Sequence, residues 1–183
     1  SSDLSRCIYE YFKAVAASTS KAIVVYNVPG RTGVNLTSET TLRLAGIPNV
    51  TAVKEASGDL GQISRVISGR PAGFGVLSGN DDQTFPVMKA GGDGVISVAS
   101  NIAPVQMVAL TEAMMEGRIE VAEDLDKRLS PLFHSCFVES NPIPVKAGLN
   151  LVGLCSGEMR LPLTEAVLST VEAMRKAIEG LEI

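Results

Sequence analysis

Two hydrophobic periodicities alternate along the first part of the chain and predict alternating strands and helices. Short apolar or β-branched runs, which are typical of strands, occupy residues 22–26, 50–58, 74–78 and 94–98. Apolar residues at helical spacing lie before and between these runs and after the last, at 7–17, 37–45, 59–67, 83–90 and 104–116. Beyond them the spacing is helical throughout, at 119–136, 145–151 and 164–180. The first run is apolar at every position, which predicts a strand buried on both faces of a parallel sheet.

Capping signals set the starts of several of these helices. Thr37 is placed to cap the helix that follows it, and either Ser57 or Asp59 is placed to cap the next one. Thr164 and Glu165 predict the start of the last helix, with Leu163 in position for a hydrophobic staple.

Four strand–helix units at intervals of about 20–28 residues indicate either a doubly wound sheet or part of an eight-fold barrel. No GxGxxG motif follows the first strand, which disfavours a dinucleotide-binding domain. Four units are half a barrel, and the end strands of such a half would expose long apolar edges. We therefore expect further strands to come from outside these 183 residues.

A lysine lies near the end of the second predicted strand, where lysine is uncommon. Active sites of α/β proteins collect at the carboxyl ends of parallel strands, and burial lowers the pKa of a lysine until its neutral amine can act as a nucleophile. Lys54 is therefore a candidate Schiff-base lysine. The alternatives are an edge-strand lysine that extends to water, or an ion pair with Glu55. That pair is a poor one, because adjacent strand residues point to opposite faces.

Composition narrows the function classes further. The 45% hydrophobic and 20% charged content is typical of a globular protein, and a net charge of −4 gives no general attraction to nucleic acid or anionic lipid. Three widely spaced cysteines form no zinc motif and suit a reducing cytosol. The single histidine, His134, argues against a histidine-rich metal centre or a serine-type triad. No apolar run is long enough to predict a membrane span.

Five motifs occur in a fixed order along the chain. They are Tyr26-Asn27-Val28-Pro29-x-Arg31-Thr32-Gly33, Val53-Lys54-Glu55-Ala56, Leu77-Ser78-Gly79-x-Asp81, Gly94-Val95-Ile96-Ser97-Val98 and Asn141-Pro142-Ile143-Pro144-Val145-Lys146. In this order and spacing they resemble the dihydrodipicolinate synthases, which belong to the pyruvate-dependent class I aldolases together with N-acetylneuraminate lyase. The resemblance covers nearly the whole chain.

The resemblance implies an α/β fold, the (β/α)8 TIM barrel, of which this chain supplies strands five to eight and a C-terminal helical region. Residues 1–117 would be the second half of the barrel, and residues 118–183 the helical region. The first half of the family's barrel, with its Gly-Thr-Thr-Gly-Glu segment and a Tyr-Tyr pair, is not in these residues. Ser1 would fall just after that tyrosine pair.

Three of the matched positions would carry chemistry. Lys54 matches the lysine that condenses with pyruvate, and Tyr26 matches a tyrosine that relays protons. Arg31 matches an arginine that binds a carboxylate, and its planar fork would suit aspartate semialdehyde. The lyase branch of the family usually lacks this arginine, so Arg31 favours synthase activity.

Four further residues match positions that line the family's substrate pocket: Gly79, Asn80, Asp81 and Ile96. Asn80 replaces a more usual acidic residue, and Ile96 would contribute its main-chain carbonyl. We expect no metal and no organic cofactor, because a covalent pyruvate imine on Lys54 would itself be the electron sink.

In the family, the proton relay also uses a threonine from the first half of the barrel and a tyrosine from a neighbouring subunit. Tyr9 and Tyr11 of this chain do not match these relay residues. We therefore expect little activity from these residues alone, with the N-terminal half supplied by a longer parent chain or a second polypeptide. The resemblance also implies pyruvate and aspartate semialdehyde as partners, a homo-oligomer (tetramer or dimer) and a cytoplasmic enzyme of lysine biosynthesis. Nucleic acid and membrane are not expected as partners.

Two other functions stay open. One is a non-catalytic half-barrel, a fragment or a degenerate paralogue, that self-associates through its open sheet edges. The other is a related pyruvate aldolase that acts on a different substrate, which the sequence separates from the synthase mainly through Arg31.

Overall fold

Four parallel strands lie side by side in the order in which they follow one another along the chain. The structure, a computed structural model, describes residues 2–181. The strands are β1 (Ile23–Asn27), β2 (Val50–Glu55), β3 (Gly75–Ser78) and β4 (Gly94–Val95). A doubly wound sheet reverses its strand order at a switch point, whereas a barrel does not. The unbroken order therefore favours the barrel topology over the doubly wound sheet.

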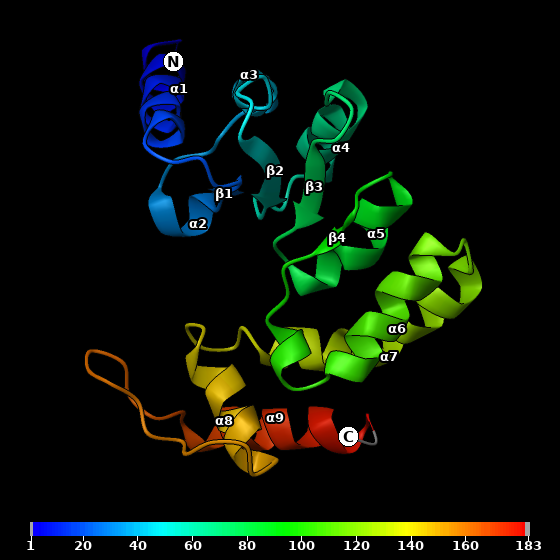
Figure 1. The fold of residues 1–183 in the computed structure, drawn as a ribbon. Coiled ribbons are helices and arrows are strands. Elements are labelled where there is room, and N and C mark those ends of the chain that lie inside the picture. The colour runs from blue at the N-terminus through cyan, green and yellow to red at the C-terminus, as the bar shows by residue number, and fades with distance from the viewer. Residues whose placement is uncertain (1, 182–183) are drawn as a thin grey trace. The chain divides into compact units, whose positions relative to one another are not determined.

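Helices cover one face of this sheet. The helices and turns of this part are α1 (Ser2–Ala17), α2 (Pro29–Thr32), α3 (Ser38–Leu44), α4 (Leu60–Gly69), the 3₁₀ turn η1 (Asp81–Gln83) and α5 (Thr84–Lys89). Helix α1 packs beside α3, and α3 packs beside α4 (Figure 1). The core beneath them contains Val25, Val53 and Val76, one from each of the first three strands, with Leu44 and Ile63 from the helices. Burial of this apolar layer holds the sheet and its helices together.

The opposite face of the sheet is open in this chain. Val24 and Tyr26 are 45% and 44% exposed, and they alternate with the buried Val25 and Asn27. The prediction that the first strand is buried on both faces is therefore wrong for this chain, because no element of the described residues covers its second face. An inward face of that kind is filled by the other strands when a barrel closes.

Two of the predicted caps are confirmed. The Thr37 hydroxyl accepts a hydrogen bond from the Thr40 amide, and the Asp59 carboxylate accepts one from the Gln62 amide at 2.9 Å. Asp59, not Ser57, is therefore the cap of α4. This cap fixes where α4 leaves the end of β2, which places Gln62 against the sheet.

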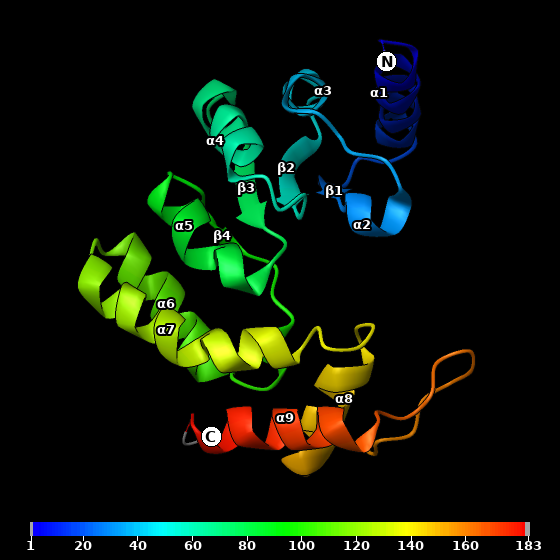
Figure 2. The same cartoon turned by 180° about the vertical axis from the view of Figure 1, so that it is seen from behind.

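The molecule divides into two compact units, the first ending at Ile96 and the second beginning at Ser97. The second unit contains the 3₁₀ turn η2 (Ala99–Asn101) and four helices, α6 (Pro104–Met115), α7 (Ile119–Ser135), α8 (Ile143–Leu151) and α9 (Leu168–Glu179). Helix α7 packs against both α6 and α9, and α8 packs against α9 (Figure 2). A Cβ atom at Gly148 would lie 2.5 Å from Ile102 and 3.0 Å from Met174, so only glycine allows this close approach of α8.

The fourth strand is shorter than the predicted 94–98. It ends at Val95, because β3 ends at Ser78 and leaves no longer neighbour to pair with. The Ser97 hydroxyl then accepts a hydrogen bond from the Ser100 amide at 2.8 Å, which turns the chain into η2.

The last helix begins later than predicted. Thr164 and Glu165 lie outside α9, which starts at Leu168 after an extended Val167. The Val167 amide donates a hydrogen bond to the Glu139 carboxylate at 3.2 Å, and this tertiary contact holds the backbone extended where local signals favour a helix.

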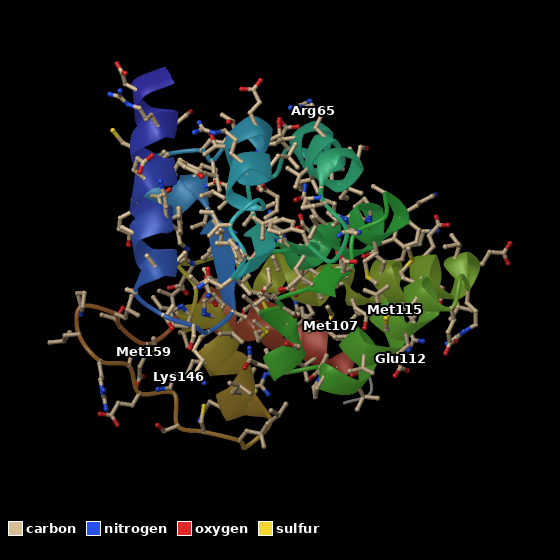
Figure 3. The ribbon with its side chains drawn as sticks, turned by 45° about the horizontal axis from the view of Figure 1, so that its top comes forward. Arg65, Met107, Glu112, Met115, Lys146 and Met159 are labelled. Atoms are coloured by element: carbon tan, nitrogen blue, oxygen red, sulfur yellow. The ribbon has the colours of Figure 1, made fainter. Side chains whose placement is uncertain are left out.

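The long segment before α9 is tied to α8. Lys146 of α8 points toward the segment that carries Met159 (Figure 3), and its ammonium donates a hydrogen bond to the Glu158 carbonyl.

No helix in residues 2–181 combines the length and the apolar character needed to cross a membrane.

Candidate functional site

Lys54 and Tyr26 are neighbours across two parallel strands. The register pairs Tyr26 of β1 with Lys54 of β2, so both side chains stand on the open face of the sheet. The Lys54 Nζ atom lies 4.4 Å from the centroid of the Tyr26 ring. The structure therefore brings these two predicted site residues together at one end of the sheet.

Several charges and the surrounding protein act on the Lys54 amine. Partial burial lowers the pKa of Lys54, the negative charge of Asp81 raises it, and the positive charge of Arg31 lowers it, with a net fall below the usual lysine value. A lower pKa increases the fraction of neutral amine, which is the nucleophilic form. The shift in the pKa of Lys54 is thus in the direction that favours Schiff-base chemistry.

Arg31 reaches this site from the loop after β1. It lies on the single turn α2 (Pro29–Thr32), which is followed by the C-terminal cap Gly33. Gly33 has φ +70° and its amide donates to the Pro29 carbonyl, so a residue that tolerates the left-handed conformation closes the turn. Arg31 is exposed, and its charge acts on Lys54.

Gly79 is needed where the end of β3 passes Lys54. Its amide donates a hydrogen bond to the Glu55 carbonyl at 2.7 Å. A Cβ atom at this position would lie 2.7 Å from the Cβ of Ala56 and 3.2 Å from the Cε of Lys54. The glycine therefore allows β3 to run directly beside the lysine.

Asp81 is buried in η1 with 1% of its surface exposed, and its charge reaches Lys54. Asn80, which precedes it, donates from its side chain to the Gln83 side chain at 3.2 Å. Ile96 follows β4, donates from its amide to the Ser78 carbonyl at 2.9 Å, and exposes 38% of its surface. These residues lie at the ends of β3 and β4, and among them it is the charge of Asp81 that acts on the Lys54 amine.

Sequence reasoning missed one feature directly behind the lysine. Glu55 is fully buried on the helix-covered face, where the side chains of Asn27 and Gln62 donate hydrogen bonds to it. The prediction that Glu55 points away from Lys54 is confirmed. An acidic residue at a core-facing position of a strand was the signal that could have indicated this polar network.

No cluster of three or more histidine, cysteine or acidic side chains in the described part of the chain has the arrangement of a metal site. The groups that the structure brings together at this end of the sheet are the amine of Lys54 and the phenol of Tyr26, with the charges of Arg31 and Asp81 acting on the amine.

Comparison with known proteins identifies the family of this chain. The model of the dihydrodipicolinate synthetase family matches residues 4–181. The chain belongs to this family.

Relatives within the family share close to half of the aligned residues. The 4-hydroxy-tetrahydrodipicolinate synthase of Archaeoglobus fulgidus is 48% identical over 176 residues, which cover 96% of this chain and 61% of that protein. The Thermotoga maritima synthase is also 48% identical, over 94% of this chain and 60% of its own length. The chain thus spans about three fifths of the length of these relatives.

Solved structures of dihydrodipicolinate synthases agree with this fold. The structure from Thermotoga maritima matches with a TM-score of 0.95 and 47% identity over 98% of this chain and 62% of its own. A variant described as the first monomeric dihydrodipicolinate synthase matches with a TM-score of 0.95 and 46% identity, over 97% of this chain and 61% of its own. The described residues therefore have the fold of the corresponding part of a dihydrodipicolinate synthase.

Replacing Gly79 with alanine should destabilise the chain, because the added methyl group overlaps Ala56 and crowds Lys54. We expect Gly79→Ala to lower the free energy of unfolding by about 1–3 kcal/mol, measured by urea denaturation. Gly30→Ala is the matched control, because a Cβ atom there would meet nothing within 4 Å. Equal unfolding midpoints for the two variants would contradict the close packing described for Gly79.

Removing the positive charge at Arg31 should raise the pKa of Lys54, because that charge lowers it. Lys54 would then hold its proton to higher pH, and its acetylation would begin at higher pH in Arg31→Ala than in the unmodified chain. Arg31→Lys retains the charge and should leave the profile in place. The test is competitive acetylation across pH with peptide mapping, using the exposed Lys21 as internal standard. Identical Lys54 profiles for Arg31→Ala and the unmodified chain would rule out this coupling.

Proposed function

We propose that this chain is the lysine-bearing part of a Schiff-base aldolase that condenses pyruvate with aspartate semialdehyde to give 4-hydroxy-tetrahydrodipicolinate. The observation that carries the proposal is Lys54, with a lowered pKa, beside Tyr26 on the open face of the sheet. The names of the relatives support the same reaction. Nothing about the stability of a sheet requires a lysine and a tyrosine to face each other there.

The proposed chemistry begins at the neutral amine of Lys54. Its Nζ atom adds to the keto carbon of pyruvate, and loss of water gives an imine. The protonated imine withdraws electrons, so the methyl carbon can lose a proton to form an enamine, and that carbon attacks the aldehyde. Hydrolysis then frees the lysine. The Tyr26 hydroxyl would move protons between these steps, and no metal or organic cofactor is called for.

The remaining site residues would hold the substrates. The guanidinium fork of Arg31 would bind the carboxylate of aspartate semialdehyde. Gly79, Asn80, Asp81 and the carbonyl of Ile96 would line the pocket.

The open face supports the proposed place of this chain in a larger barrel. Four parallel strands in unbroken order, covered on one face, would be strands five to eight of a (β/α)8 barrel. Residues 1–117 would form that half and residues 118–183 the C-terminal helical region. The other strands, and the threonine of the proton relay, would come from outside the 183 residues. A tetramer or dimer would supply the relay's second tyrosine, and the cytoplasm stays the predicted compartment.

A second candidate is a half-barrel that binds a second copy of itself and catalyses nothing. The exposed Val24 and Tyr26 on the uncovered face favour it, because such a face is stabilised by any apolar cover. It predicts self-association without Schiff-base chemistry at Lys54.

A chimera would test the proposed reaction. The part of the Thermotoga maritima relative that precedes the matched region is fused to this chain, and condensation of pyruvate with aspartate semialdehyde is followed by product mass. We expect product formation that falls by roughly three or more orders of magnitude in Lys54→Arg, because arginine cannot form the imine. Lys89→Arg, an exposed lysine on α5, is the matched control and should retain activity.

The same chimera separates the alternatives. Arg31→Lys should raise the aldehyde concentration that gives half-maximal rate by about tenfold, because a single ammonium group replaces a bidentate fork. A folded chimera without Lys54-dependent product, beside an active Thermotoga maritima enzyme, would contradict the proposed function. An unchanged aldehyde requirement in Arg31→Lys would indicate a different second substrate.

A further inference from the structure

A buried carboxylate lies directly behind the proposed nucleophile. Glu55 is 0% exposed and accepts hydrogen bonds from three different segments. The Asn27 side-chain amide lies 2.9 and 3.1 Å from its two oxygens, the Ser57 backbone amide 2.8 Å from Oε1, and the Gln62 side-chain amide 3.3 Å from Oε2. All of these partners are neutral N–H donors, and a carboxylate is the side chain that only accepts.

This carboxylate bonds across the same two strands that carry the reactive pair. The register places Asn27 opposite Glu55, one step after Tyr26 opposite Lys54. Successive residues of a strand point to opposite faces, so the Asn27–Glu55 bond lies on the covered face and the Tyr26–Lys54 contact on the open one. Any slip of β1 against β2 that separates one pair also separates the other.

The same network holds the loop that carries Arg31. Asn27 accepts a hydrogen bond from the Leu36 amide at 2.9 Å and donates to the Asn35 side chain at 2.9 Å. Gln62 donates to the Leu36 carbonyl at 3.1 Å. Arg31 lies between Asn27 and these two loop residues, so both ends of its segment are held by one hydrogen-bonded cluster.

We propose that Glu55 is a positioning residue, which together with Asn27 and Gln62 fixes the strand register and the loop that bring Tyr26, Arg31 and Lys54 into one site. A buried network with every member satisfied is rigid, because each broken bond leaves an unpaired polar group in a low-dielectric interior. The consequence for catalysis rests on the proposed function of Lys54. The fixing of the strand register and of the loop by Glu55 does not depend on that function.

The test compares variants at the two ends of the same strands. Glu55→Gln replaces one acceptor oxygen with an NH₂ group that would face N–H donors. Asn49→Ala is the matched control. The Asn49 side chain also links separate segments, because it donates hydrogen bonds to the backbone carbonyls of Ala16, Thr19 and Lys21, but it lies just before the amino end of β2, away from Lys54. Gln62→Met removes one donor while keeping side-chain length, and it replaces Glu55→Gln in the comparison if that variant does not fold.

The readout is the contact between Lys54 and the Tyr26 ring, followed by NMR on the chain labelled with [ε-¹³C]lysine. Protons above an aromatic ring are shifted upfield, and the Lys54 signal is identified by its absence in Lys54→Arg. Tyr26→Leu gives the chemical shift of the Lys54 signal in the absence of the aromatic ring. We expect the upfield shift to fall toward that value in Glu55→Gln and to be retained in Asn49→Ala. The midpoints of urea unfolding give the stability of each variant, so that a loss of the contact can be distinguished from a loss of folding.

Retention of the full shift in folded Glu55→Gln, or an equal loss in Asn49→Ala, would overturn the positioning role. Trapping of pyruvate with borohydride on the same variants adds the catalytic arm, with a loss on the order of tenfold or more expected in Glu55→Gln. If neither the unmodified chain nor the chimera traps pyruvate at Lys54, the proposed function fails, and the NMR comparison still decides whether Glu55 positions Lys54.

Discussion

The register between β1 and β2 is the constraint on which the site depends. It sets two cross-strand pairs at once, Tyr26 with Lys54 on the open face and Asn27 with Glu55 on the covered face. Neighbouring segments depend on the same end of the sheet: Gly79 bonds to the Glu55 carbonyl, and the Asp59 cap places Gln62 against the Glu55 carboxylate. Lys54 and its surroundings are thereby held by strand geometry, which is more rigid than a loop.

Local chemistry made much of the fold predictable. The alternating periodicities, together with the caps at Thr37 and Asp59, correspond to the strands and helices of the first unit. The failures have tertiary causes. The late start of α9 follows from the bond between Val167 and Glu139, and the early end of the fourth strand follows from the length of its neighbour. Neither partner is close in sequence, so no window of local pattern contains the information.

The site shows the same division. Lys54 was recognisable because a lysine at the end of an apolar strand is unusual, and Tyr26 and Arg31 because their motif is distinctive. The cluster of Glu55 and Gln62 was not, because its members lie on different elements and each is ordinary alone. The predicted double burial of β1 was wrong for a related reason: a run of apolar residues indicates that both faces will be covered, but not by which chain segment.

The central claim is that this chain alone presents a nucleophilic amine at Lys54. Peptide mapping by mass spectrometry after incubation of the purified chain with pyruvate and borohydride tests it most directly, because reduction makes an imine permanent. We predict a reduced pyruvate adduct on the peptide that contains Lys54 and its absence from Lys54→Arg. A folded chain with no adduct at Lys54, or with adducts spread evenly over its exposed lysines, would contradict the claim.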